Sequence, residues 1–192
     1  MSENRIIDCI TKIETEDGRK RMLMSSDFKS FGRNVQIFSQ VKFVRSHVID
    51  IGNYVKIDDF TFIYGGTGIK IGNYVHIASF VSIIGGGELE LGDYSALAAG
   101  SRIITGSNLH QGGYHMTASA PEEQQNVKRG KIIIGKDAVI GTNAIVHPCL
   151  TIGDGAILGS NSLALTDLEP WTIYAGSPCK KIGIREQIRR FD

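Results

Sequence analysis

Large apolar residues recur at every sixth position along most of this chain. Ile51, Ile57 and Ile63 show the interval, and a glycine directly follows the first residue of each such run. The pattern predicts repeating units that each direct one apolar side chain inward for every six residues. Six runs of this kind are present, and they begin at Phe31, Ile51, Ile71, Leu91, Ile134 and Ile152.

The spacing of these runs selects the fold class. The first four begin 20 residues apart and the last two 18 apart, so each run is three hexads, with a two-residue insertion in the longer ones. An amphipathic helix would repeat every 3.6 residues, and a β-sandwich or barrel would show period-two strands separated by hairpin turns. The fixed six-residue phase over 51–108 and 134–164 instead predicts an all-β parallel β-helix, whose three-sided coils stack about 4.8 Å apart.

Glycine supports this interpretation. The chain has 23 glycines in 192 residues but only 4 prolines, so the excess is not a flexible linker. The corners of a three-sided coil need tight or left-handed backbone, which favours Gly, Asn and Asp. Small residues such as Ser95, Ala138 and Ala156 at the fifth hexad position suit a crowded interior corner.

The repeat is interrupted once. The hexad that begins at Ile103 is followed by Ile134 rather than by a new run eight residues later. We therefore expect residues 109–131 to leave the prism as a loop. Insertions in solenoids project from one face, which is often the binding face.

Both ends of the chain depart from the hexads. Thr15 to Met24 is charged and is predicted to be a short helix that caps the first coil, and Ile184 to Phe191 a short basic helix that closes the other end. We divide the chain into an N-terminal cap at 1–30, a β-helix domain at 31–169 and a C-terminal segment with its helix at 170–192.

Charge and composition narrow the function. Lys and Arg number 21 and Asp and Glu 20, a net charge of +1, which argues against a nucleic-acid surface. No apolar run reaches the roughly 18 residues of a membrane span, and the N-terminus lacks the apolar region of a secretory signal. Three widely spaced cysteines argue against a disulfide framework. These observations predict a cytoplasmic protein.

Several segments resemble one family. The hexads together with YAGSPCKKI at 174–182 resemble the hexapeptide-repeat acyltransferases, and within them the N-acetyltransferases of nucleotide-linked amino-dideoxy sugars, of the viosamine 4-N-acetyltransferase type. This resemblance implies a left-handed β-helix and a homotrimer. Relatives usually carry Thr-Asn-Pro where this chain has Thr-Ala-Ser at 117–119, which leaves the sugar open. The shared segments are FKSFG at 28–32, YVHIASF at 74–80, MTASAPEEQQNV at 116–127 and LEPWTIYAG at 168–176.

The resemblance implies acetyl transfer from acetyl-CoA to the amino group of a nucleotide-linked sugar, for the synthesis of O-antigen or another surface glycan. One alternative is O-acetylation of a glycan or small acceptor. Another is a non-catalytic or carbonic-anhydrase-like β-helix, but the anhydrase relatives need a His-x4-His pattern that is missing from the coils. The cysteines and histidines show no metal-ligand spacing, so we expect no metal.

The resemblance also implies site residues. His110, at the start of the loop, is the first candidate for the base that deprotonates the attacking amine, and His76, on the third coil, is the second. A mechanism without any protein base is the alternative. Asn108, Tyr114 and His115 are expected to contact the sugar nucleotide. The residues expected to bind acetyl-CoA are Thr142, Ser160, Thr166, Lys180 and Lys181.

Overall fold

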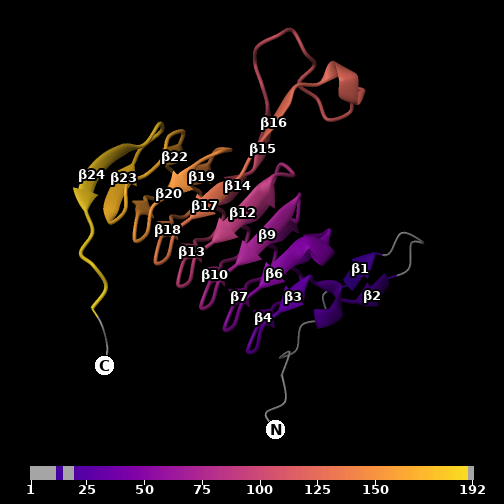
Figure 1. Ribbon diagram of the computed structural model, residues 1–192, viewed down its shortest axis with the longest axis horizontal. Coiled ribbons are helices and arrows are strands. Elements are labelled where there is room, and N and C mark those ends of the chain that lie inside the picture. The colour runs from indigo at the N-terminus through magenta and orange to yellow at the C-terminus, as the bar shows by residue number, and fades with distance from the viewer. Residues whose placement is uncertain (1–11, 15–19, 190–192) are drawn as a thin grey trace.

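The computed structural model describes residues 12–14 and 20–189, and they form a three-sided prism of parallel strands with one projecting loop (Figure 1). Within these residues the chain makes six complete coils and part of a seventh. Each complete coil contributes one strand to each of three faces, and the strands of successive coils hydrogen-bond to one another. The predicted parallel β-helix is thereby confirmed.

Three sheets form the faces. The first face contains β3 (Ser30–Phe31), β6 (Ile49–Ile51), β9 (Gly68–Ile71), β12 (Glu88–Leu91), β17 (Ile132–Ile134) and β20 (Thr151–Ile152). The second contains β4 (Gln36–Ile37), β7 (Lys56–Ile57), β10 (His76–Ile77), β13 (Ala96–Leu97), β18 (Val139–Ile140), β21 (Ile157–Leu158), β23 (Thr172–Ala175) and β24 (Lys180–Ile184). The third contains β5 (Lys42–Val44), β8 (Phe62–Tyr64), β11 (Ser82–Ile84), β14 (Arg102–Ile104), β19 (Ile145–Val146) and β22 (Leu163–Ala164).

The register of the sheets follows the hexads. On the first face, the residue that opens each run lies beside its counterpart on the next coil, as Ile51 does beside Ile71. Ile57 and Ile63, which open the second and third hexads of that run, are fully buried on the other two faces. The two-residue insertion adds a second inward residue to the first face, such as the buried Ile69. Inward aliphatic side chains from every coil therefore form one continuous core.

A column of tyrosines occupies a corner where the sequence pattern favoured Gly, Asn or Asp. Tyr54, Tyr74 and Tyr94 have left-handed backbone, and neighbouring rings stack 4.7 Å apart between the first and second faces. Left-handed backbone costs a non-glycine residue roughly 1–2 kcal/mol, and an aromatic pair returns about 0.5–1.5 kcal/mol. Beside this column, Asn53 donates its backbone N–H and side-chain amide to Asn73 Oδ1, both at 2.9 Å. Stacking and side-chain hydrogen bonds thus stabilise these corners.

The predicted terminal helices are wrong. At the N-terminal end, β1 (Lys12–Glu14) and β2 (Lys20–Met22) form an antiparallel pair, and residues 15–19 lie outside the described part of the chain. A 3₁₀ turn, η1 (Ser25–Asp27), follows.

At the C-terminal end, β24 (Lys180–Ile184) pairs antiparallel with β23, and residues 185–189 are not helical. Residues 190–192 lie outside the described part. A helix of eight residues is marginal in water, whereas a strand here satisfies the open edge of the second face. Arg185 fastens this strand, because its Nη1 donates to the backbone carbonyls of Asp137 at 2.6 Å and Gly155 at 3.1 Å.

The projecting loop leaves the prism between the third and first faces. It rises on an antiparallel stem of β15 (Gly106–Asn108) and β16 (Val127–Arg129), and η3 (Glu122–Gln124) lies in its outer part (Figure 1). Another 3₁₀ turn, η2 (Ser46–Val48), lies at the same corner of the first coil. The interruption of the hexads therefore marks an excursion that the sheet hydrogen bonds bypass.

Candidate active site

The second face carries a histidine–carboxylate pair. His76, at the start of β10, points outward, and its Nε2 lies 2.9 Å from Asp58 Oδ2 on the preceding coil. The other oxygen of Asp58 lies 3.2 Å from Lys56 Nζ. When the ring is neutral, donation from Nε2 to this carboxylate leaves Nδ1 as the acceptor nitrogen. This arrangement suits a general base whose orientation is fixed by a third group.

The charge of Asp58 is secured by its neighbours. Partial burial would raise the pKa of this carboxyl, but the hydrogen bonds from His76 and Lys56 outweigh that effect and hold its pKa below the usual value. Asp58 therefore stays ionised through the neutral range. Sequence reasoning missed this residue, although a signal was present: Asp58 follows Ile57 at the corner just past β7, one coil before His76.

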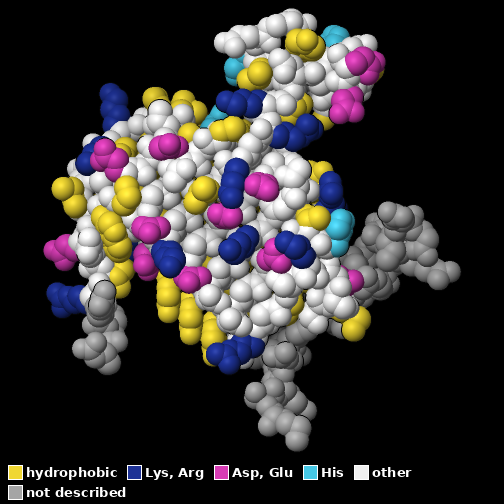
Figure 2. Space-filling view, in the orientation of Figure 1, with side chains coloured by type: hydrophobic (Ala, Val, Ile, Leu, Met, Phe, Trp, Pro, Cys, Tyr) yellow, Lys and Arg dark blue, Asp and Glu magenta, His cyan; other side chains and the backbone are white. Residues whose placement is uncertain are grey.

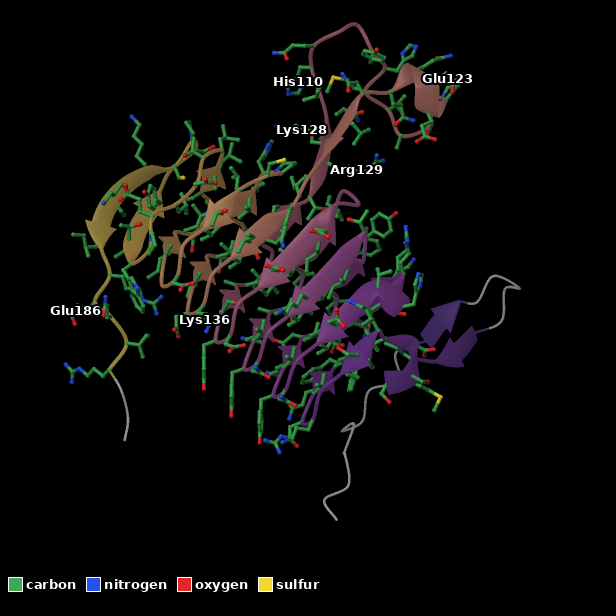
Figure 3. The ribbon with its side chains drawn as sticks, in the orientation of Figure 1. His110, Glu123, Lys128, Arg129, Lys136 and Glu186 are labelled. Carbon is green, nitrogen blue, oxygen red and sulfur yellow. The ribbon has the colours of Figure 1, made fainter. Side chains whose placement is uncertain are left out.

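His110 has different surroundings. It lies on the projecting loop above the stem that carries Lys128 and Arg129 (Figure 3). Its side chain is exposed, and among residues 12–14 and 20–189 no carboxylate forms an ion pair with it. Among the residues that the structure describes, no side chain hydrogen-bonds to this imidazole and orients it.

The two candidate bases are far apart in topology. His76 lies on the second face, whereas the loop with His110 leaves from the opposite corner, between the third and first faces. The sequence already indicates this separation, because His76 lies in the first hexad of its run whereas the loop follows the third hexad of the next run. One chain therefore does not bring the two imidazoles together.

The residues expected to bind acetyl-CoA fall into two groups. Thr142 and Ser160 are exposed at the corner between the second and third faces on successive coils, where Asn161 N donates to Thr142 O. Lys180 lies beside Ala175, where β23 reaches that same corner. Thr166 is exposed beyond β22, at the corner between the third and first faces. Three of the five candidates thus line one edge of the prism.

Lys181 has an acidic partner. Its Nζ lies 2.6 Å from Glu169 Oε2, and this hydrogen bond raises the pKa of Lys181. Both side chains are exposed, so a phosphate group has access to the lysine. Lys180, one residue earlier, is also exposed at the strand edge.

The residues expected to contact the sugar nucleotide all lie on the projecting loop. Asn108 ends β15, and its Oδ1 is buried without a hydrogen-bond partner, beside the Asn108–Val127 pair of the stem. His115 forms a bridge with Gln125 across the loop. Tyr114 and His115 are both exposed. The three residues therefore share the loop, apart from the prism edge that carries the acetyl-CoA candidates.

The first face is a balanced ionic surface. Acidic and basic side chains are interspersed over β6, β9 and β12 (Figure 2). Lys29 Nζ lies 2.8 Å from Asp50 Oδ2, and Lys131 Nζ lies 2.9 Å from Glu90 Oε1. The hydrogen bond from Lys29 lowers the pKa of Asp50 despite its partial burial. These pairs complement one another across the strands, as in an ordinary solvated face.

No group of three His, Cys, Asp or Glu side chains that would hold a metal ion occurs in the part of the chain that the structure describes. In the same part, none of the helical segments has the length and apolar character needed to cross a membrane.

Known proteins share this repeat and its arrangement. The family model described as bacterial transferase hexapeptide (six repeats) matches residues 131–163. A dTDP-4-amino-4,6-dideoxy-D-glucose acyltransferase from Escherichia coli is 37% identical over 166 residues, 86% of each chain. The chain belongs to the hexapeptide-repeat acyltransferases. It is therefore an acyl-CoA-dependent acyltransferase, as the resemblance implied.

Solved structures agree with this family. A variant of AntD, an N-acyltransferase from Bacillus cereus, in complex with dTDP-4-amino-4,6-dideoxyglucose and coenzyme A superposes with a TM-score of 0.81 at 34% identity, covering 85% of this chain and 87% of that one. AntD with dTDP and 3-hydroxybutyryl-CoA gives 0.80 at the same identity, over 84% and 86% of the chains. A chloramphenicol acetyltransferase from Klebsiella aerogenes is 49% identical, but over only 29% of this chain and 26% of that protein.

Proposed function

We propose that this hexapeptide-repeat acyltransferase transfers an acetyl group from acetyl-CoA to the amino group of a dTDP-linked amino-dideoxy sugar. This proposal rests on the 37% identity to a dTDP-4-amino-4,6-dideoxy-D-glucose acyltransferase along 86% of both chains. That match spans the loop as well as the coils, and so includes the segment that distinguishes this chain from a bare solenoid. The product is a nucleotide sugar of the kind used for surface glycans, made in the cytoplasm.

In the proposed reaction the amine nitrogen attacks the thioester carbonyl carbon. A C–N bond forms, the carbonyl oxygen becomes an oxyanion, and the C–S bond then breaks to release CoA thiolate. The nitrogen loses one proton, which a neutral imidazole or the departing thiolate accepts. The enzyme must align the two substrates, and this alignment lowers the barrier without any new bond to the protein.

Between the two candidate bases, the geometry favours His76. Asp58 orients its ring and stabilises the imidazolium that forms on proton transfer. His110 has no such partner among the described residues of its own chain. We assign His76 the role of base and Asp58 that of its positioning residue, and His110 contacts substrate from the loop.

The site requires more than one copy of the chain. Because the loop and the second face lie on opposite sides of the prism, the loop of one copy meets the second face of a neighbour in a closed homotrimer. The edge that carries Thr142, Ser160 and Lys180 then borders the groove between the copies. In this arrangement acetyl-CoA binds along the edge, with Lys180 and Lys181 at its phosphates.

The test is a substrate panel. Purified protein and acetyl-CoA are incubated with dTDP-, UDP- and GDP-linked 3-amino and 4-amino sugars and with the matching hydroxy sugars, and products are identified by mass spectrometry. We expect N-acetylation of dTDP-4-amino-4,6-dideoxyglucose to be the fastest reaction. Turnover of the hydroxy sugars alone would establish the O-acetyltransferase alternative and refute the proposal.

A further inference from the structure

A second aromatic column runs along the corner between the second and third faces. The rings of Phe60 and Phe80 stack 5.2 Å apart at an interplanar angle of 10°. Both rings are exposed, Phe60 to 51% and Phe80 to 62%. The same column continues through Gly100 and Asn143, which occupy the equivalent corner on the next two coils.

The column of rings stops at Gly100. This residue has a φ of 72° and no side chain, so the step beyond Phe80, about 4.8 Å high, holds no ring. The tyrosine column differs, because Asp137 supplies a side chain in the step beyond Tyr94. Phe80 is therefore the last ring of this column, and among the described residues Phe60 is the ring that stacks on it.

The polar group nearest to this step is the side-chain amide of Asn143. A Cβ atom placed on Gly100 would collide with Asn143 Oδ1, so the amide reaches down from its own coil to the level of Gly100. Asn143 is exposed, and its amide makes no hydrogen bond to any described residue. It offers one acceptor and two donors, the groups needed to pair with the edge of a heteroaromatic ring.

We propose that Phe80 and Asn143 form a stacking subsite for a nucleobase, an inference that rests on the proposed function. Every nucleobase has a π-face that stacks on an aromatic side chain. The step beyond Phe80 holds the Asn143 amide beside Gly100 but no ring, so the exposed Phe80 ring is open to a planar partner. The amide of Asn143 then hydrogen-bonds to the edge of that base.

The location agrees with both substrates of the proposed reaction. Phe80 follows His76 by four residues along the same coil, and Thr142 directly precedes Asn143 on the edge expected to bind acetyl-CoA. The base is therefore either the pyrimidine of the nucleotide sugar or the adenine of CoA. Stacking and edge hydrogen bonding would be the same for either base, and binding measurements with dTDP and with CoA distinguish the two sources.

The experiment measures the affinity of the full-length protein for dTDP and, separately, for CoA by isothermal titration calorimetry. Phe80→Ala is expected to lower the affinity for one of the two ligands roughly 5- to 150-fold, the range for one lost base–aromatic stack. Phe80→Tyr keeps the ring and should stay near the wild-type affinity. Tyr94→Ala is the matched control, because it removes the exposed end ring of the other column.

The two arms identify the source of the base. A loss confined to dTDP assigns the subsite to the nucleotide sugar, and a loss confined to CoA assigns it to adenine. Asn143→Ala leaves the column of rings intact and should weaken the same ligand several-fold, which keeps the test open if Phe80→Ala fails to fold.

Unchanged affinities for both ligands in folded Phe80→Ala and Asn143→Ala proteins would overturn the inference while leaving the proposed function in place. A wild-type protein that binds neither dTDP nor CoA would overturn the proposed function itself.

Discussion

Serine hydroxyls inside the prism differ in whether they have a hydrogen-bond partner. Ser101 and Ser162 occupy the same interior column, with the fully buried Ala144 between them. Ser101 Oγ is buried without a hydrogen-bond partner among the described residues, whereas Ser162 Oγ accepts from Gly176 N at 2.9 Å. An unpaired buried hydroxyl is destabilising, and a paired one is stabilising by about 1 kcal/mol.

Ser101→Ala should therefore leave the free energy of unfolding unchanged or raise it by up to about 1 kcal/mol. Ser162→Ala should lower it by about 1 kcal/mol or more, because Gly176 N loses its acceptor. Urea titrations of both variants at one protein concentration measure the difference. A clear destabilisation by Ser101→Ala would mean that its hydroxyl has a partner after all.

The Asp58–His76 pair makes a prediction about turnover. Asp58→Asn should lower kcat roughly 10- to 100-fold, because the imidazole loses the carboxylate that orients it, while His76→Ala should lose about 10²–10⁴-fold, the usual contribution of a base. The control is Asp59→Asn, the same change at the next residue, whose Oδ1 accepts from Gln40 N at 2.8 Å. Equal effects of the two Asp variants would show that the pair has no special part in catalysis.

The same pair predicts a change in acid stability. The pKa of Asp58 is lowered in the folded protein, so its ion pairs stabilise fully above the unfolded value of about 3.9 and this contribution is lost as pH falls through the lower folded value. The difference in unfolding free energy between wild type and Asp58→Asn should shrink as pH falls below about 4. A difference that grows toward low pH would contradict the lowered pKa.

At the scale of elements, the coils were predictable from sequence and the termini were not. Each face takes one inward side chain per hexad, so the positions of Ile57, Ile77 and Leu97 directly encode the register of β7, β10 and β13. The segment Ile184 to Phe191 has no such constraint. Its first residue, Ile184, ends β24, which forms because the edge of β23 is free, and a local pattern does not contain that edge.

The candidate site was predictable only in part, for a related reason. Types of residue such as His76 and His110 can be read from the sequence, but Asp58 acquires its role only when successive coils stack. The same is true of Phe80 and Asn143, which lie far apart in sequence but occupy one corner column, with Gly100 between them. Interactions along the prism axis are thus the part of the site that a linear reading misses.

The projecting loop makes a prediction as an element. Residues 109–126 lie beyond the β15–β16 stem, and replacing them by Asn-Gly joins the two strands through a two-residue hairpin turn. The sheets of the prism do not pass through the loop, so the thermal transition should shift by only a few degrees. The rate of acetyl transfer should fall at least 100-fold, because the replaced residues include His110, Tyr114 and His115, which are expected to contact the substrate. A variant that retains its turnover would place the site away from the loop.

The whole molecule makes the last prediction, because a site built from two copies is subject to complementation. His76→Ala lacks the proposed base but has a normal loop, and the loop-replaced variant has the reverse defect. Each alone should form an inactive trimer. When the two are co-expressed with different tags, every mixed ring of three places an intact second face next to an intact loop at about a third of its interfaces.

Mixed trimers purified through both tags should therefore recover turnover of that order relative to wild type, while a physical mixture of the two preformed trimers stays inactive until the subunits exchange. Light scattering on the same samples gives the oligomeric state. If each site used the second face and loop of one chain, no combination of these two variants would regain activity. Inactive mixed trimers would therefore exclude a shared site, and a monomeric wild-type protein would exclude the assembly on which it depends.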